Sequence, residues 1–185
     1  MGTNKSALKP SIHFEEFLKT LPSLSDKTIA ITGTTSGTGL VAARTCSSMG
    51  ATVIMLNRPS ERAKKVLENL KQENHPGSVH HVDCDLQDFE SVQNSIPEVQ
   101  KLCENGLDVL CNNAGVMALE DKATVDGFDV QMQTNHLSHF LLTKLLFPLL
   151  EQAELKKGEA RIVNHSSMAR LMVKSLEAKY LEKNG

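Results

Sequence analysis

A glycine-rich turn between an apolar run and a helix-like segment constrains this chain more than any other feature. Residues 32–39 read TGTTSGTG, follow the apolar run 28–31 and lead into a second apolar stretch. We expect Gly33 to reverse the chain, Gly37 to leave room for a ligand and Gly39 to bring the helix close to the strand. The free N–H groups at the start of that helix would face an anion, and a pyrophosphate is the usual occupant.

The spacing of these glycines, TGxxxGxG, differs from the GxGxxG of the standard dinucleotide fingerprint. Short glycine motifs recur freely, so an ordinary tight strand-to-helix turn is the alternative interpretation.

Strand-like and helix-like segments alternate from residue 26 onward. Strands are expected at 28–32, 52–56, 79–83, 107–111 and 161–164. Helices are expected at 39–49, 60–72, 88–104 and 126–153, the last with apolar residues Phe140, Leu141, Leu145 and Leu149 and a bend at Pro148. The order predicts an α/β fold: a Rossmann-type doubly wound parallel sheet with helices on both faces, incomplete at its C-terminal end. We expect this domain to span residues 26–185.

Residues 1–25 are predicted to form an N-terminal arm with a short amphipathic helix. The helix would lie between Ser11, a candidate N-cap, and Pro22, with an apolar stripe of Phe14, Phe17, Leu18 and Leu21. Such a stripe covers the domain's own flank or lies on a membrane surface or a partner. Met1-Gly2 with Ser6 fits the pattern for N-myristoylation, and a disordered start is the alternative.

Composition excludes several classes of function. The 20 basic and 22 acidic residues nearly balance, so nucleic acid is not an expected partner. The four cysteines are scattered without a CxxC pair, which is typical of a reducing compartment. No apolar run approaches a membrane span and no secretory signal is visible, so we expect a soluble, cytoplasmic protein.

Two groups of histidines are alternative metal ligands. His80 and His81 lie near Asp83, Cys84 and Asp85, but neighbouring strand residues point to opposite faces and cannot all converge. His136 and His139 have helical i, i+3 spacing, but no third ligand can be assigned. We therefore predict no metal site.

Four motifs together resemble the short-chain dehydrogenase/reductase family over about residues 26–170. They are the turn 32–39, the NNAG turn 112–115, the segment NHLSHF at 135–140 and the segment RIVNHSS at 161–167. The run around Asn135 is most similar to the retinol-dehydrogenase-like members. The resemblance implies an NAD(P)-dependent oxidoreductase.

The resemblance also implies a set of nucleotide-binding residues. In the glycine turn they are Gly33, Thr35, Ser36, Gly37, Thr38 and Gly39, and elsewhere Arg58, Asp85, Asn112, Asn113, Ala114 and Gly115. Asp85 is similar to the family's acidic contact to the adenine amino group, and a helix cap is its alternative role. The NNAG turn resembles a wall of the cofactor site, and a stabilising Asn/Gly turn is the alternative.

The residues that end the second strand favour NADP over NAD. An acidic side chain there accepts the ribose hydroxyl and repels a 2′-phosphate, but residues 56–60 contain no carboxylate. Arg58 offers a forked donor to a phosphate, and a solvated loop arginine is the alternative.

The resemblance implies catalysis by a tetrad of Asn, Ser, Tyr and Lys. Asn135 matches the asparagine, Ser167 the serine, and Tyr180 lies at a plausible distance for the tyrosine. The lysine should follow four residues later, but position 184 is Asn and Lys183 is three residues on, a rotation of about 100° on a helix. The alternative interpretation is that the chain stops before its catalytic helix.

Two hypotheses remain for function. The first is hydride transfer between a nicotinamide and a carbonyl or alcohol substrate that is retinoid-, steroid- or lipid-like, by a protein that forms a homodimer at full length. The second is a nucleotide-binding module or an inactive fragment that lacks the YxxxK pair.

Overall fold

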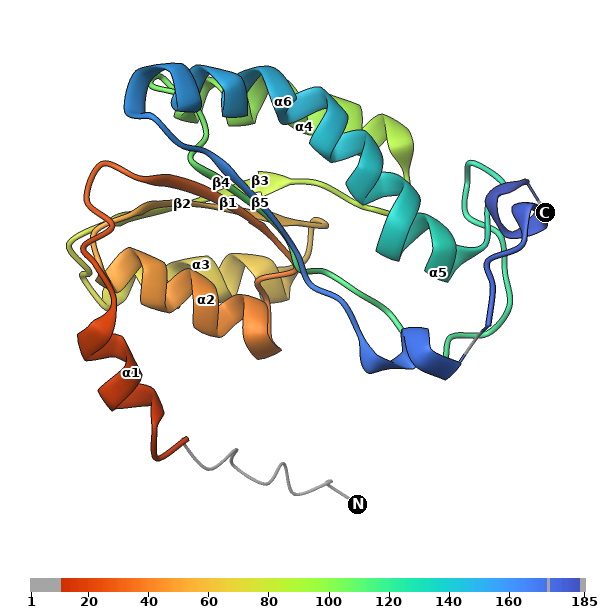
Figure 1. The fold of residues 1–185 in the computed structure, drawn as a ribbon, viewed down its shortest axis with the longest axis horizontal. Helices are drawn as coiled ribbons and strands as arrows, with labels where there is room; N and C mark the ends of the chain where they lie inside the picture. Colours follow the sequence, from red (N-terminus) through yellow and green to blue (C-terminus); the bar gives the residue numbers. More distant parts are fainter. Residues whose placement is uncertain (1–10, 173, 184–185) are drawn as a thin grey trace.

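The fold is a five-stranded parallel sheet between two layers of helices (Figure 1). The computed structural model describes residues 11–172 and 174–183. The strands are β1 (Thr28–Thr32), β2 (Thr52–Asn57), β3 (Ser78–Asp83), β4 (Val109–Asn112) and β5 (Arg161–Asn164), in the order β3-β2-β1-β4-β5. The α-helices are α1 (Phe14–Thr20), α2 (Gly37–Ser48), α3 (Glu61–Gln72), α4 (Phe89–Leu102), α5 (Val130–Met132) and α6 (Ser138–Lys157).

Each face of the sheet carries its own core. Helices α4 and α6 cover one face and α2 and α3 the other, as Figure 1 shows. The α4/α6 core contains Leu56, Leu110 and Leu146, whereas the opposite core contains Ile31 and Val53. Because β1 and β2 are covered on both faces, nearly all their residues are buried, which explains their continuous apolar runs. The predicted doubly wound sheet with helices on both faces is confirmed.

Local sequence signals set several of the helix ends. The Ser60 hydroxyl accepts a hydrogen bond from the Ala63 N–H at the start of α3, and Asp88 caps α4 through the Glu90 N–H. Gly158 ends α6 in the left-handed conformation. Helix α2 begins at Gly37, two residues before its expected start. Strand β4 begins at Val109, two residues after its expected start.

The predicted long helix over 126–153 is present as a continuous helical run with shifted ends and a π-helical turn inside it. Helix α5 starts at Val130, a π-helical turn spans Gln133–Leu137, and α6 then continues past Pro148 to Lys157. The buried row of α6 consists of Leu142, Leu146 and Leu150, with Leu141, Leu145 and Leu149 beside it, whereas Phe140 is exposed.

Helix α1 begins later than the sequence suggested. Its N-cap is His13 and no side chain caps it, so the predicted N-cap role of Ser11 is wrong. The Ser11 carbonyl instead accepts a hydrogen bond from the Phe14 N–H. The myristoylation pattern at Gly2 and Ser6 lies outside the described residues.

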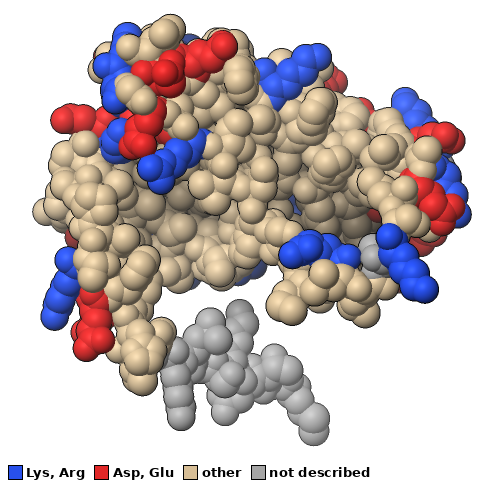
Figure 2. All heavy atoms as spheres, viewed as in Figure 1, with Lys and Arg blue, Asp and Glu red and all other residues tan. Residues whose placement is uncertain are grey.

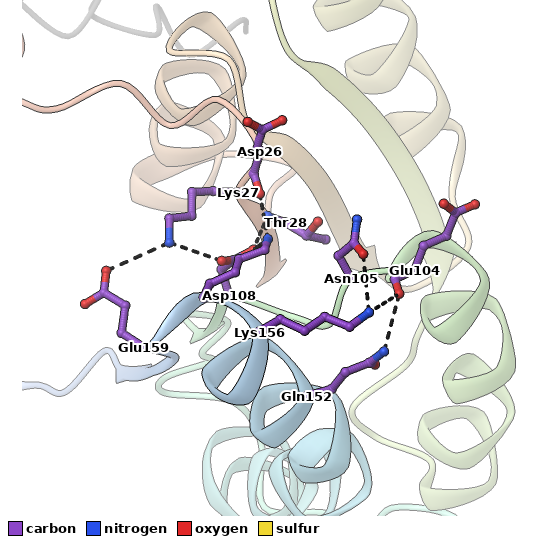
Figure 3. Close-up of polar contacts among 10 residues, drawn as sticks. Asp26, Lys27, Thr28, Glu104, Asn105, Asp108, Gln152, Lys156 and Glu159 are labelled. Carbon is purple, nitrogen blue, oxygen red and sulfur yellow. Dashed lines mark hydrogen bonds and ion pairs between the residues drawn. The ribbon is translucent and has the colours of Figure 1, made fainter.

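A buried carboxylate fastens the edge of the sheet opposite the carboxyl ends of the strands (Figure 3). Asp108 precedes β4 and is only 2% exposed. It accepts hydrogen bonds from the Thr28 N–H at 2.8 Å and Lys157 Nζ at 2.7 Å, and Lys27 Nζ lies 3.2 Å from its other oxygen. Burial alone would raise the pKa of Asp108, but these three donors outweigh it and lower the pKa. Asp108 therefore ties β1 and β4 to the end of α6.

The surface carries charges of both signs. On the face drawn in Figure 2, basic and acidic side chains are interspersed rather than gathered by sign. Within residues 11–172 and 174–183, no helix is long and apolar enough to cross a membrane.

Candidate functional site

A cleft of about 440 Å³ opens at the carboxyl ends of the central strands. From β1 the chain moves outward to β2 and β3, then returns to place β4 on the other side of β1. Ligands of open parallel sheets bind where the strand order reverses in this way. The cleft is lined by the glycine turn, by the ends of β2 and β3 and by the turn after β4.

Most of the predicted nucleotide-binding residues line this one cleft. They are Gly33, Thr35, Ser36, Gly37, Thr38, Arg58, Asp85, Asn113, Ala114 and Gly115. Gly39 and Asn112 are absent from the lining, so the structure gives these two a different setting. The roles of all these residues in binding stay predictions.

The glycines of the turn differ in what surrounds them. Gly37 has a φ of +58°, and a Cβ built on it meets nothing within 4 Å, so open space lies where a ligand would approach. A Cβ on Gly39 would lie 2.3 Å from the Gly33 carbonyl oxygen. Gly39 therefore allows close packing within the turn, whereas Gly37 faces the cleft.

The two asparagines after β4 have separate tasks. Asn112 is 5% exposed and donates to Thr143 at 3.0 Å and Asn164 at 2.9 Å, which braces α6 and β5 against β4. Asn113 donates to the Thr32 carbonyl at 2.9 Å and accepts from the Thr38 hydroxyl at 3.0 Å. Asn113 therefore joins the glycine turn to the wall of the cleft.

The end of β2 presents an amide and two arginines to the cleft. Asn57 is buried, and its side chain is hydrogen-bonded to Thr34 of the glycine turn. Arg58 and Arg62 both line the cleft, with Ser60 between them at the start of α3. Sequence reasoning missed Arg62, although its position in the first turn of a helix capped by Ser60 was a usable signal.

Asp85 already has a structural task. Its Oδ1 accepts the Gln87 N–H at 2.9 Å in the turn before α4, whereas the helix cap itself is Asp88. The neighbouring Cys84 also lines the cleft, and burial raises the pKa of its thiol to about 11.

Asn135 lies on the π-helical turn and is paired with the loop after β4. Its Oδ1 accepts the Val116 N–H at 2.8 Å and its Nδ2 donates to the Val116 carbonyl at 2.8 Å. The polar groups of the side chain are therefore engaged by the loop after β4, and a further contact of this residue is made by the Asn135 backbone carbonyl.

That carbonyl has a histidine partner that sequence reasoning weighed only as a metal ligand. His139 Nδ1 lies 3.2 Å from the Asn135 carbonyl oxygen, and Nε2 lies 2.9 Å from the Thr32 hydroxyl. Burial lowers the pKa of His139, and nearby His136 lowers it further, although the contact with Asn135 opposes this. Among the described residues, no group of three His, Cys, Asp or Glu side chains is placed to hold a metal ion.

The remaining predicted catalytic residues lie outside the cleft lining. The Ser167 hydroxyl accepts the Ala169 N–H at 3.1 Å. Tyr180 is half exposed in a 3₁₀ turn, and Lys183 Nζ lies 5.7 Å from the centroid of the Phe128 ring. No hydrogen bond among the described residues joins Asn135, Ser167 and Tyr180, so their shared catalytic role stays a prediction.

Comparison with known proteins assigns the family. The family model for short chain dehydrogenase matches residues 27–181, and the chain therefore belongs to the short-chain dehydrogenase family.

Similar proteins differ widely in name. An uncharacterized oxidoreductase of Schizosaccharomyces pombe is 37% identical over 154 residues, which cover 82% of this chain and 45% of the relative. The human polyprenol dehydrogenase is 34% identical over 146 residues, which cover 79% of this chain and 44% of the relative. The chain thus spans about half the length of the curated relatives it matches.

A solved structure with a bound nucleotide is also similar. The L-sorbose reductase of Gluconobacter frateurii, in complex with NADPH and L-sorbose, superposes with a TM-score of 0.67 at 25% identity. The similarity covers 85% of this chain and 59% of that protein.

Proposed function

We propose that this chain is the nucleotide-binding part of an NADP-dependent oxidoreductase that transfers hydride between the nicotinamide and a carbonyl or alcohol substrate. The observation that carries the NADP assignment is the rim formed by Arg58 and Arg62 beside Asn57. A nicotinamide dinucleotide would supply the hydride chemistry when bound. The chain's own residues would bind and orient it.

The residues of the cleft fit such a nucleotide. Open space at Gly37 accommodates a diphosphate next to the N-terminus of α2, where free N–H groups and the helix dipole favour an anion. At the other end, Asp85 lines the cleft and would accept a hydrogen bond from an amino group of the base. Two guanidinium groups between these ends match an additional phosphate better than a free ribose hydroxyl.

The substrate is proposed to be a lipid-like carbonyl or alcohol. The human relative named polyprenol dehydrogenase supports this class, and so does the similarity of the segment around Asn135 to retinol-dehydrogenase-like proteins. Ser167 would orient the substrate oxygen, and a tyrosine would exchange the proton. We propose a dimer for the whole protein on the same family ground.

A fluorescence titration of the chain with NADPH and NADH tests the cofactor assignment. Tighter binding of NADPH is expected because only NADPH carries the 2′-phosphate that the two arginines can bind. Equal affinities would contradict NADP specificity. Absence of binding by both nucleotides would contradict the nucleotide-binding function itself.

The second candidate function is a binding module without turnover. It is favoured by one observation: Lys183 Nζ lies 5.7 Å from the centroid of the Phe128 ring, and no contact between Lys183 and Tyr180 is found among the described residues. Turnover by the chain itself, followed as NADPH oxidation with a lipophilic aldehyde, would contradict the second candidate.

A further inference from the structure

A buried chain of hydrogen bonds runs from the π-helical turn to the glycine turn. It passes from the Asn135 carbonyl through the His139 ring to the Thr32 hydroxyl, and on to two backbone N–H groups after β4. His139 is 6% exposed and Thr32 is fully buried, so water does not compete for these contacts.

The donor and acceptor roles along this chain are set by the chemistry of its two ends. The Asn135 carbonyl can only accept, so His139 Nδ1 carries the proton. The Thr32 oxygen accepts the Asn113 N–H at 3.0 Å and the Ala114 N–H at 2.9 Å, which occupy both of its lone pairs. The hydroxyl proton has two acceptors, the Cys111 carbonyl at 3.5 Å and the bare Nε2 of a neutral imidazole at 2.9 Å, and the shorter contact assigns it to Nε2.

We infer that His139 is a positioning residue, which holds the Asn135 carbonyl and the 113–114 turn in a fixed relation through its neutral, Nδ1-protonated ring. The inference rests on the proposed function in that Asn135 would belong to the catalytic group. His139 itself is absent from the lining of the cleft.

A second tie makes the relation between these segments testable. The Asn135 side chain holds the Val116 N–H, whereas Thr32 holds the Asn113 and Ala114 N–H groups. Exchange of the Val116 amide proton therefore reports on Asn135, and exchange of the amides at 113 and 114 reports on Thr32.

Two substitutions separate the contact made by His139 Nδ1 from the contact made by its Nε2. An asparagine amide reaches the level of Nδ1 and a glutamine amide reaches the level of Nε2. His139→Asn should keep Val116 protected and speed exchange at Asn113 and Ala114 about tenfold, as expected for loss of a buried hydrogen bond. His139→Gln should give the reverse pattern.

The exposed neighbour His136 provides the matched control. His136→Asn should change none of the three exchange rates, since its ring makes no hydrogen bond in the described residues. Equal exchange patterns in His139→Asn and His139→Gln would overturn the inference.

A measurement on the unaltered chain protects the test from variants that fail to fold. Nitrogen-15 spectra of the ring should show a neutral His139 with the proton on Nδ1 at pH 7, and a proton on Nε2 would overturn the inference. All of these experiments are made without nucleotide. A failure to bind NADPH would therefore contradict the proposed function and leave this result unaffected.

Discussion

Asn57 and Thr34 are joined by hydrogen bonds in both directions. Asn57 Oδ1 accepts the Thr34 N–H at 2.7 Å, and Asn57 Nδ2 donates to Thr34 Oγ1 at 2.9 Å. The last residue of β2 is thus fixed to the glycine turn as a neutral amide. The charge that a ribose or a phosphate would meet at this point comes from Arg58 and Arg62, just after the strand.

The first prediction concerns those arginines. Arg58→Asp should weaken NADPH binding about 10- to 100-fold, because a charge-assisted hydrogen bond is replaced by repulsion, and should favour NADH. Arg62→Gln should weaken NADPH binding without favouring NADH. Arg161→Gln is the control. Arg161 begins β5, at the end of the sheet away from the cleft, so this change should not alter NADPH binding. Fluorescence titration gives each affinity, and an unchanged NADPH/NADH ratio in Arg58→Asp would contradict the assignment.

The second prediction separates ligand space from backbone strain at Gly37. Gly37→Val should abolish nucleotide binding and cost about 1–2 kcal/mol of stability, because a branched residue is strained at positive φ. Gly37→Asn tolerates this conformation better and should lose binding with less loss of stability.

Gly39→Ala provides the contrast to these variants. Its Cβ would lie 2.3 Å from the Gly33 carbonyl, so we expect it to destabilise the fold. Thermal unfolding and NADPH titration on the three variants measure both quantities. Normal binding by Gly37→Asn would mean that the turn is only structural.

The third prediction concerns Asp108. Asp108→Asn should lower the free energy of unfolding by about 2–3 kcal/mol, less than for a fully buried pair because both lysines are partly in solvent. The control is Glu159→Gln, which removes an exposed carboxylate 3.9 Å from Lys27 Nζ. It should change the free energy of unfolding by less than about 0.5 kcal/mol. Urea unfolding at pH 7 compares the variants, and equal losses would refute this role.

The fourth prediction is the pH dependence that Asp108 confers. Its pKa is lowered in the folded chain, so its contribution is complete above the ordinary value of about 3.9 and is lost as pH falls through the folded pKa. Stability should therefore fall more steeply below pH 4 in the unaltered chain than in Asp108→Asn. Parallel curves for the two proteins would argue against the lowered pKa.

The fifth prediction concerns the buried thiols. Burial raises the pKa of Cys84 to about 11 and that of Cys103 to about 12. Both should resist alkylation at pH 8 until the chain is unfolded, which mass spectrometry of labelled peptides can measure. Because the folded state holds these protons longer, stability should decline as pH rises above the ordinary cysteine value of about 8.5.

The sequence predicted the sheet well because each strand of its centre is buried on both faces. The short continuous apolar runs 28–31 and 52–56 are typical of strands buried on both faces. The glycine turn between β1 and α2 identified the end of the sheet where the cleft opens. Motif spacing also selected residues that line one cleft.

Other parts of the site depend on contacts that no local pattern contains. The π-helical turn at Gln133–Leu137 carries no propensity signal, so the sequence pattern there predicts a plain helix. In sequence, the spacing of His136 and His139 points only to a possible metal ligand. The contact of His139 with Thr32 could not be predicted, because Thr32 precedes it by more than a hundred residues. The sequence showed that position 184 is not a lysine. It did not show that Lys183 Nζ lies over the Phe128 ring.

The π-helical turn also sets the helical phase of α6. Each residue added to or removed from a helix rotates the rest of that helix by about 100°. A π-helical turn holds about one residue more than an α-helical turn, so a one-residue deletion within 133–137 lets the segment close as a plain α-helix and keeps the row Leu142, Leu146 and Leu150 facing α4. A one-residue insertion has no such outlet and would turn that row away from α4 and withdraw His139 from Thr32. This short stretch should therefore accept the loss of a residue better than the gain of one.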